Sequence, residues 1–83
     1  MTIRFEMKEL NQILIITFEE NYDEKEVMDA IDGFYYEWLN YEETADEEMW
    51  DEIENEMVDD WIVNHLNDYD YMVNSWEVEE IKE

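Results

Sequence analysis

The stretch that decides the fold is TIRFEMKELNQILIITFE, residues 2–19. Ile3, Phe5 and Met7 alternate with polar residues, and this period of two predicts a strand with one buried face. Residues 12–19 are mostly β-branched and apolar, which is typical of a more buried strand. Asn11 ends the short segment between them, and asparagine tolerates the positive φ of a tight turn. The stretch therefore predicts an N-terminal β-hairpin.

After the hairpin, residues 23–40 predict a helix. Asn21 or Asp23 can cap it, and two glutamates follow in the first turn, where the helix dipole favours negative charge. Apolar residues recur at helical spacing and define a stripe: Val27, Ile31, Phe34 and Trp38. Gly33 lies inside this helix, and its simplest role is to let a bulky neighbour pack closely.

A second, longer helix is predicted from Ala45 to Leu66. Residues 44–47 read Thr-Ala-Asp-Glu, which matches the capping box that opens many helices. The apolar face of this helix is expected to hold Met49, Trp50, Ile53, Met57, Trp61, Ile62 and Leu66.

The remaining residues, 67–83, fit two structures. Tyr69, Met72, Val73 and Trp76 have helical spacing, whereas Trp76 and Val78 alternate with glutamates as in a strand. A two-stranded hairpin is marginal in water and a third strand would support it, so a turn or short helix followed by a strand is preferred. The sequence thus predicts an α+β fold: a hairpin, two acidic amphipathic helices, and a C-terminal strand or short helix. Residues 1–83 are expected to form a single compact domain.

Composition and charge exclude several classes of function. The chain has 27 Asp and Glu against 4 Lys and Arg, a net charge of −23. Such a surface repels a phosphate backbone and an anionic membrane, so no direct binding of nucleic acid or membrane is expected. Disorder is also disfavoured, because hydrophobic residues make up 46% of the chain and aromatic residues 16%. The chain has no cysteine and no long apolar run, which predicts a cytoplasmic protein.

The densest charge lies in residues 42–60, where eleven of 19 residues are acidic and none is basic. Like charges at i, i+4 destabilise a helix, and an ordinary exposed helix would alternate Glu with Lys. A row of carboxylates can instead imitate the row of phosphates on duplex DNA. With two acids further on, the predicted partner-binding residues are Glu42, Glu43, Asp46, Glu47, Glu48, Asp51, Glu52, Glu54, Glu56, Asp59, Asp60, Asp68 and Asp70. We expect Glu48, Asp51, Glu52, Glu56 and Asp59 to share one helix face.

Catalysis and metal binding find little support in the sequence. His65 is the one histidine and Ser75 is one of the few hydroxyl nucleophiles, and His65 is better explained as a cation at a helix C-terminus. An EF-hand loop starting at Asp68 would have Met72 at position 5 and Val73 where glycine is required. We therefore expect no enzyme activity, no cofactor and no specific metal site.

The aromatic residues are expected to serve mainly as core. Those at strand or helix spacing are Phe5, Phe18, Phe34, Trp38, Trp50, Trp61 and Trp76. Tyr35, Tyr36 and Tyr41 flank the stripe of the first helix and are expected at the surface. Tyr69 and Tyr71 stand beside aspartates, and either could stack on arginine side chains of a partner or cap the edge of the core.

Residues 38–56, WLNYEETADEEMWDEIENE, resemble the acidic helical stretch of a small type II-A anti-CRISPR protein. In size, charge and lack of cysteine the chain is similar to phage-encoded DNA mimics, which include anti-CRISPR proteins, anti-restriction proteins and uracil-DNA glycosylase inhibitors. This resemblance implies a stoichiometric inhibitor that occupies the DNA-binding or PAM-reading groove of a bacterial nuclease. It carries over no functional residues position by position.

Three hypotheses follow. The first is a DNA-mimic inhibitor of a basic, nucleic-acid-binding defence protein such as a Cas effector or restriction enzyme, acting as a monomer or dimer. The second is an acidic immunity protein or antitoxin that neutralises a basic toxin. The third is a halophilic domain without a charge-based function, which the heavy aromatic content disfavours.

Overall fold

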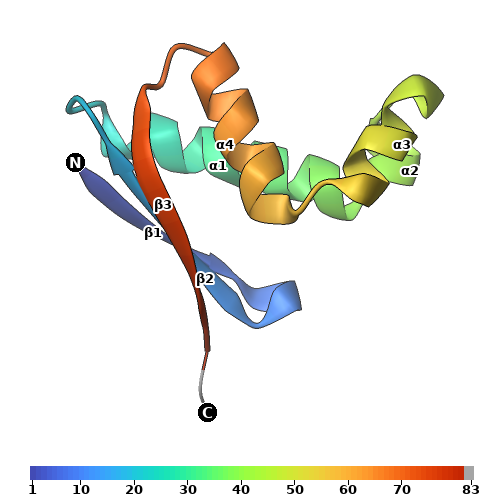
Figure 1. Cartoon of the computed structure of the whole chain (residues 1–83), viewed down its shortest axis with the longest axis horizontal. Helices are drawn as coiled ribbons and strands as arrows, with labels where there is room; N and C mark the ends of the chain where they lie inside the picture. The colour runs from blue at the N-terminus through green and yellow to red at the C-terminus, as the bar shows by residue number, and fades with distance from the viewer. Residues whose placement is uncertain (82–83) are drawn as a thin grey trace.

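A computed structural model describes residues 1–81 and confirms the predicted α+β fold (Figure 1). In chain order the elements are β1 (Thr2–Met7), a 3-10 turn η1 (Lys8–Leu10), β2 (Gln12–Phe18), α1 (Glu24–Leu39), α2 (Tyr41–Thr44), α3 (Glu47–Asn55), α4 (Val58–Asp68) and β3 (Val73–Glu80).

The strands form one antiparallel sheet in the order β1-β2-β3. The predicted hairpin is confirmed: Thr2 pairs with Thr17 and Met7 with Gln12, and Asn11 takes the expected positive φ of 56° after η1. Of the two structures that residues 67–83 allowed, the strand is found, because β3 pairs with β2 from Val73 to Glu80. Lys82 and Glu83, at the end of that prediction, lie outside the described residues.

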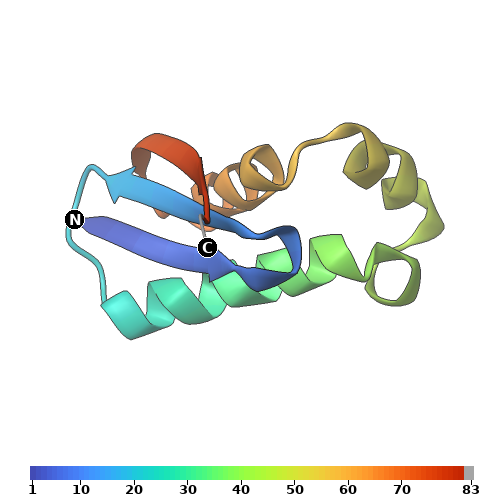
Figure 2. The same cartoon turned by 90° about the horizontal axis from the view of Figure 1, so that it is seen from below.

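One face of the sheet carries the core. Alternate residues of β1 and β2 are buried there, as the period of two predicts: Ile3, Phe5, Met7, Leu14, Ile16 and Phe18. Helices α1 and α4 supply the other half of the core with Val27, Ile31, Tyr35, Val58, Trp61, Ile62 and Leu66. Figures 1 and 2 show α1 along this face and no helix over the opposite face.

Helix α1 begins where the sequence predicts, with Asp23 as its N-cap. The Asp23 carboxylate accepts a hydrogen bond from the backbone N–H of Glu26 at 3.1 Å. The surface position predicted for Tyr35 is wrong, since only 5% of this residue is exposed. It continues the Val27–Ile31 stripe, and its hydroxyl donates to the Glu9 carboxylate at 2.6 Å, which satisfies the polar end of a buried ring. Burial and this hydrogen bond raise the pKa of Tyr35, and the same bond lowers the pKa of Glu9.

The single helix predicted from Ala45 to Leu66 is wrong: the chain forms α3 and α4, with Glu56 and Met57 extended between them. The reason is that the apolar residues of the two halves would lie on different sides of one straight helix. Ile53 and Ile62 are both buried, but nine residues are about two and a half turns of helix, so a straight helix would point them in opposite directions. The break lets each half bury its own face, and it leaves Met57, predicted as core, 67% exposed.

The capping box predicted at residues 44–47 is also absent. Asp46 is the N-cap of α3 and makes no side-chain capping bond. Thr44 instead belongs to α2, where its hydroxyl donates to the carbonyls of Asn40 at 3.0 Å and Glu37 at 3.3 Å. Thr44 therefore closes one helix rather than opening the next.

Gly33 does not have the packing role that we expected. It lies on the exposed side of α1, its φ is not positive, and a Cβ at this position would meet no atom within 4 Å.

Glycine in a helix interior costs roughly 0.5–1 kcal/mol relative to alanine. Gly33→Ala should therefore raise the free energy of unfolding by about that amount and Tm by a few degrees, as measured by thermal circular dichroism. An unchanged or lower Tm would contradict this assignment.

Candidate functional site

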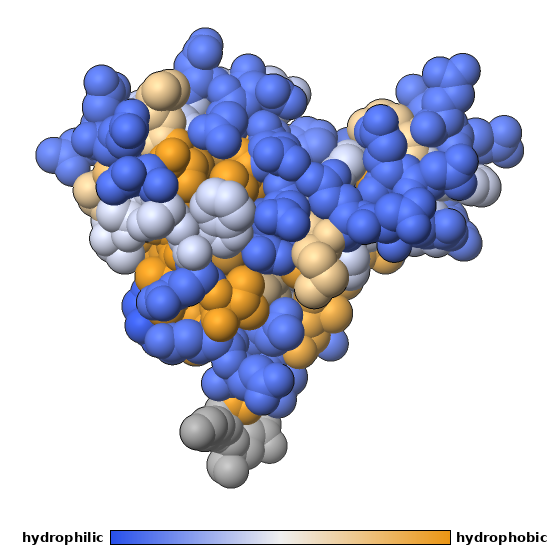
Figure 3. Space-filling view, in the orientation of Figure 1, coloured by the Kyte–Doolittle hydropathy of each residue, from blue (hydrophilic) through white to orange (hydrophobic). Residues whose placement is uncertain are grey.

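Helices α2 and α3 stand to one side of the sheet and the α1–α4 pair (Figures 1 and 2). We call residues 41–55 the acidic lobe. It contains eight acidic residues and no basic residue, and all eight are exposed: Glu42, Glu43, Asp46, Glu47, Glu48, Asp51, Glu52 and Glu54. In Figure 3 hydrophilic residues cover this lobe almost continuously, whereas hydrophobic residues show over the sheet. With eight exposed acidic residues and no basic residue, the lobe is a strongly negative projection of the molecule.

Trp50 holds the acidic lobe together. Its indole Nε1 lies 3.0 Å from the carbonyl oxygen of Tyr41 and 3.2 Å from that of Ala45, so α3 donates to both ends of α2. The Tyr41 ring meets the Trp50 ring edge-on, with centroids 6.2 Å apart. The Tyr41 hydroxyl donates to Glu54 Oε1 at 2.7 Å. The sequence placed Trp50 on the apolar face of a long helix and gave no sign of this role.

Three contacts attach the lobe and the residue that follows it to the rest of the protein. Ile53 is the one fully buried residue of α3, and it joins the main core. At the end of the lobe, the Trp38 indole N–H donates to the backbone carbonyl of Glu56 at 3.2 Å. The Glu56 carboxylate accepts from the Asn64 amide of α4 at 2.5 Å. The lobe is thus anchored at α1, at α4 and in the core, so the backbone positions of its acidic residues are fixed relative to the rest of the protein.

The structure does not bring all the predicted acids onto one surface. The expected shared face of Glu48, Asp51, Glu52, Glu56 and Asp59 is wrong, because the chain breaks at Glu56. Glu56, Asp59 and Asp60 are half-buried at the start of α4, and the Asp59 carboxylate accepts from the Trp76 indole N–H at 3.0 Å. Asp68 and Asp70 lie at the far end of α4, about 15 Å along its axis at 1.5 Å per residue. The lobe alone gathers eight of the thirteen predicted residues.

The carboxylate of Glu54 acts on the neighbouring phenol. The hydrogen bond from the Tyr41 hydroxyl to Glu54 is the main reason that the pKa of Tyr41 rises to about 12. Partial burial and the charges of Glu54 and Glu42 act in the same direction. Since the folded pKa lies above the ordinary value of 10, the stabilisation by this bond is present below pH 10 and is lost as pH rises through about 12.

Glu54→Gln should therefore lower the pKa of Tyr41 while leaving the lobe folded. The titration of the Tyr41 ring carbon by NMR measures this shift directly. Glu52→Gln serves as the matched control, because Glu52 belongs to the same helix and does not act on the Tyr41 hydroxyl. Equal titration midpoints in the two variants would show that the Tyr41–Glu54 bond is not formed in solution.

The charge of the whole chain should make stability depend on salt. A net charge of −23 on 83 residues destabilises the compact state by self-repulsion, and salt shortens the range of that repulsion. We expect Tm to rise as ionic strength increases from about 10 mM to about 300 mM. Differential scanning calorimetry with NaCl measures this dependence, and a Tm independent of salt would argue against repulsion as a significant term.

Several large apolar side chains are exposed against expectation. Trp76 was predicted as core, yet it is 40% exposed, although its indole N–H reaches Asp59 at the start of α4. Val78 is 37% exposed, because α4 runs alongside only the first half of β3 (Figure 1). Tyr36 reaches the surface as predicted. Tyr69 is 65% exposed and stacks on the Phe34 ring, with centroids 5.4 Å apart, while Tyr71 is half-buried against the core. The one tyrosine of this pair that lines the core edge is therefore Tyr71.

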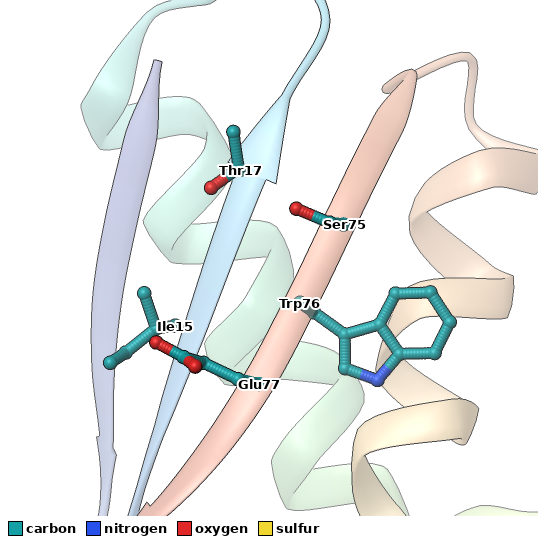
Figure 4. Close-up of a pocket in the computed structure, with 5 residues that line it drawn as sticks. All are labelled: Ile15, Thr17, Ser75, Trp76 and Glu77. Carbon is teal, nitrogen blue, oxygen red and sulfur yellow. The ribbon is translucent and has the colours of Figure 1, made fainter.

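No metal cluster is found in the part of the chain that the structure describes. No three metal-ligating side chains among residues 1–81 are grouped to hold an ion. A shallow groove of about 330 Å³ lies between β2 and β3 and is lined by Ile15, Thr17, Ser75, Trp76 and Glu77 (Figure 4). His65 lies in the last turn of α4, as expected, with Nδ1 2.8 Å from the Trp61 carbonyl oxygen.

No helix within residues 1–81 has the length and apolar character needed to cross a membrane. Comparison with models of known protein families, with curated proteins and with solved structures finds no match to this chain.

Proposed function

We propose that this protein is a DNA-mimic inhibitor that occupies the nucleic-acid-binding groove of a basic bacterial defence nuclease. The observation that carries the proposal is the acidic lobe, which presents eight exposed carboxylates and no basic residue on a projecting pair of helices. The protein would act by occupancy alone, with no chemistry of its own. Its place of action would be the cytoplasm of a bacterial cell, with a phage as the source of the gene.

Three features of the lobe support this proposal. Its carboxylates follow one another at intervals of a helical turn or less, which approximates the closely spaced charges along a DNA backbone. Hydrogen bonds from Trp50, Tyr41 and Trp38 fix the two helices, so little backbone order remains to be gained on binding. The lobe stands clear of the sheet, which suits insertion into a groove (Figure 2).

Electrostatic steering gives the proposal a kinetic signature. Complementary charge raises association rates and makes them fall steeply with ionic strength. Binding should therefore weaken strongly with salt, and most of that loss should appear in the association rate constant rather than in dissociation. Surface plasmon resonance over a salt series separates the two rate constants.

A panel of purified defence nucleases tests the proposal. Each Cas effector or restriction enzyme is mixed with a labelled target duplex, and fluorescence anisotropy reports whether the protein prevents DNA binding at near-stoichiometric amounts. Loss of DNA binding by one nuclease of the panel is the expected result. Inhibition of cleavage with DNA binding intact would contradict mimicry.

The second candidate is an acidic immunity protein or antitoxin that neutralises a basic toxin. The observation that favours it is the presence of exposed apolar residues beside the acids. Met57, just beyond the lobe, is 67% exposed, and Trp76, whose indole donates a hydrogen bond to Asp59, is 40% exposed. Large apolar side chains of this kind are better suited to contact with the surface of a partner protein than to imitation of DNA. An immunity protein need only block an active site, so it would not have to compete with nucleic acid.

A further inference from the structure

Strand β3 has one free edge within the described residues. It pairs with β2 alone, at the end of the order β1-β2-β3. An edge strand presents unpaired N–H and C=O groups to which another extended chain can add. Figure 1 shows α4 beside the first half of β3 and no helix beside its second half. Residues 77–80 therefore leave their outer backbone edge uncovered.

The side chains along this edge differ between the two faces of the sheet. The register places Trp76 and Val78 on the face that carries the core, where they keep 40% and 37% of their surface exposed. Glu77 and Glu79 lie on the opposite face. Figure 4 shows this division, with the Trp76 ring turned toward α4 and Ser75 and Glu77 on the other side. A chain added beside β3 would meet apolar and acidic side chains in alternation over residues 76–79, and Glu80 follows as a further acid on the face of Val78.

Charge selects the kind of chain that can be added. Residues 73–80 include three glutamates and no basic residue. Charged side chains at an edge usually prevent aggregation, but three charges of one sign exclude only an acidic chain. A second copy of this protein would place glutamates opposite glutamates and bring two net charges of −23 together. A basic segment would gain from the same glutamates, although Glu79 already lies 4.0 Å from the exposed guanidinium of Arg4.

We propose that the free edge of β3 binds an extended, basic segment of the partner protein by strand addition. Lysine or arginine side chains of that segment lie beside Glu77 and Glu79, and an apolar side chain lies beside Val78. Backbone hydrogen bonds supply affinity, and the alternation supplies specificity. The inference rests on the proposed function in that the partner is basic, and it adds a second contact surface to the acidic lobe.

A peptide of the same length as β3, in which Lys alternates with Val, is the probe for this surface. Added to the full chain, it should slow hydrogen exchange of the outward-facing β3 amides and shift their NMR signals. A peptide of identical sequence with alternate backbone amides N-methylated keeps the charge but cannot extend the sheet. It should bind roughly tenfold more weakly or worse. Equal binding of the two peptides, or unchanged β3 amide exchange, would overturn the proposal.

Variants separate this surface from the lobe. Glu77→Lys with Glu79→Lys should abolish peptide binding, whereas Glu19→Lys with Glu20→Lys, which changes the net charge equally at two exposed loop positions, should retain it. If both double variants lost peptide binding, net charge alone would explain the loss, and the proposal would be overturned. A lobe variant with Glu48, Asp51 and Glu52 changed to Lys should bind the peptide normally. If that lobe variant still inhibits the nuclease, the proposed function fails while the β3 surface stands.

Discussion

Changing Glu48, Asp51 and Glu52 to lysine is expected to lower affinity for the inhibited nuclease by roughly 100-fold or more. These three residues lie within about one turn of α3 and are exposed, so the change affects the lobe surface and no buried contact. Each substitution replaces an attraction to a basic groove by a repulsion. Glu56 is left unchanged, because its carboxylate binds Asn64 and its replacement would loosen the anchoring of the lobe.

The matched control changes Glu19, Glu20 and Asp32 to lysine. These positions are also exposed, and the net charge changes by the same amount, from −23 to −17 in both variants (three substitutions of +2 each). Anisotropy with labelled duplex measures inhibition, and circular dichroism confirms that both variants fold. Equal loss of inhibition in the two variants would show that net charge, and not the lobe, determines recognition.

Trp61→Ala is expected to produce the largest loss of stability, about 3–5 kcal/mol. Trp61 is 2% exposed, and its indole N–H donates to the Phe34 carbonyl at 3.2 Å, which ties α4 to α1. Its ring also lies against the His65 ring, with centroids 3.9 Å apart. Small domains have about 5–15 kcal/mol of total stability, so this loss would remove about a third to a half of a stability of about 10 kcal/mol and most of one at the lower end.

Trp76→Ala provides the comparison for Trp61. The Trp76 ring is 40% exposed and has one side-chain hydrogen bond, to Asp59, so its removal should cost about 1 kcal/mol. Urea denaturation followed by circular dichroism gives both free energies of unfolding. A cost for Trp61→Ala no larger than that for Trp76→Ala would contradict the placement of Trp61 in the core.

The sequence correctly predicts those elements that depend on a pattern within a few neighbouring residues. The alternation of Ile3, Phe5 and Met7, the turn at Asn11 and the cap at Asp23 each depend on a few neighbouring residues, and the structure has all of them. The C-terminal strand was one of two alternatives. Pairing with β2 decides it, and pairing depends on residues about sixty positions away in the chain.

The break between α3 and α4 was missed because neither proline nor glycine marks it. Its signal is a change of phase: Ile53 and Ile62 lie half a turn out of step, so one straight helix cannot bury both. The acidic lobe depends on that break and on hydrogen bonds from Trp38 and Trp50 to backbone carbonyls. Such bonds join separate elements and leave no periodic pattern in the sequence. Its acidic character could be predicted, and its shape could not.

Competition between this protein and duplex DNA for one site on the inhibited nuclease tests the central claim most directly. Labelled protein is titrated onto nuclease that holds increasing amounts of target duplex, and anisotropy gives the apparent Kd. If the acidic lobe occupies the DNA groove, the apparent Kd rises in proportion to the concentration of duplex, and no ternary complex forms. An apparent Kd independent of duplex, with protein and DNA bound to the nuclease together, would contradict DNA mimicry.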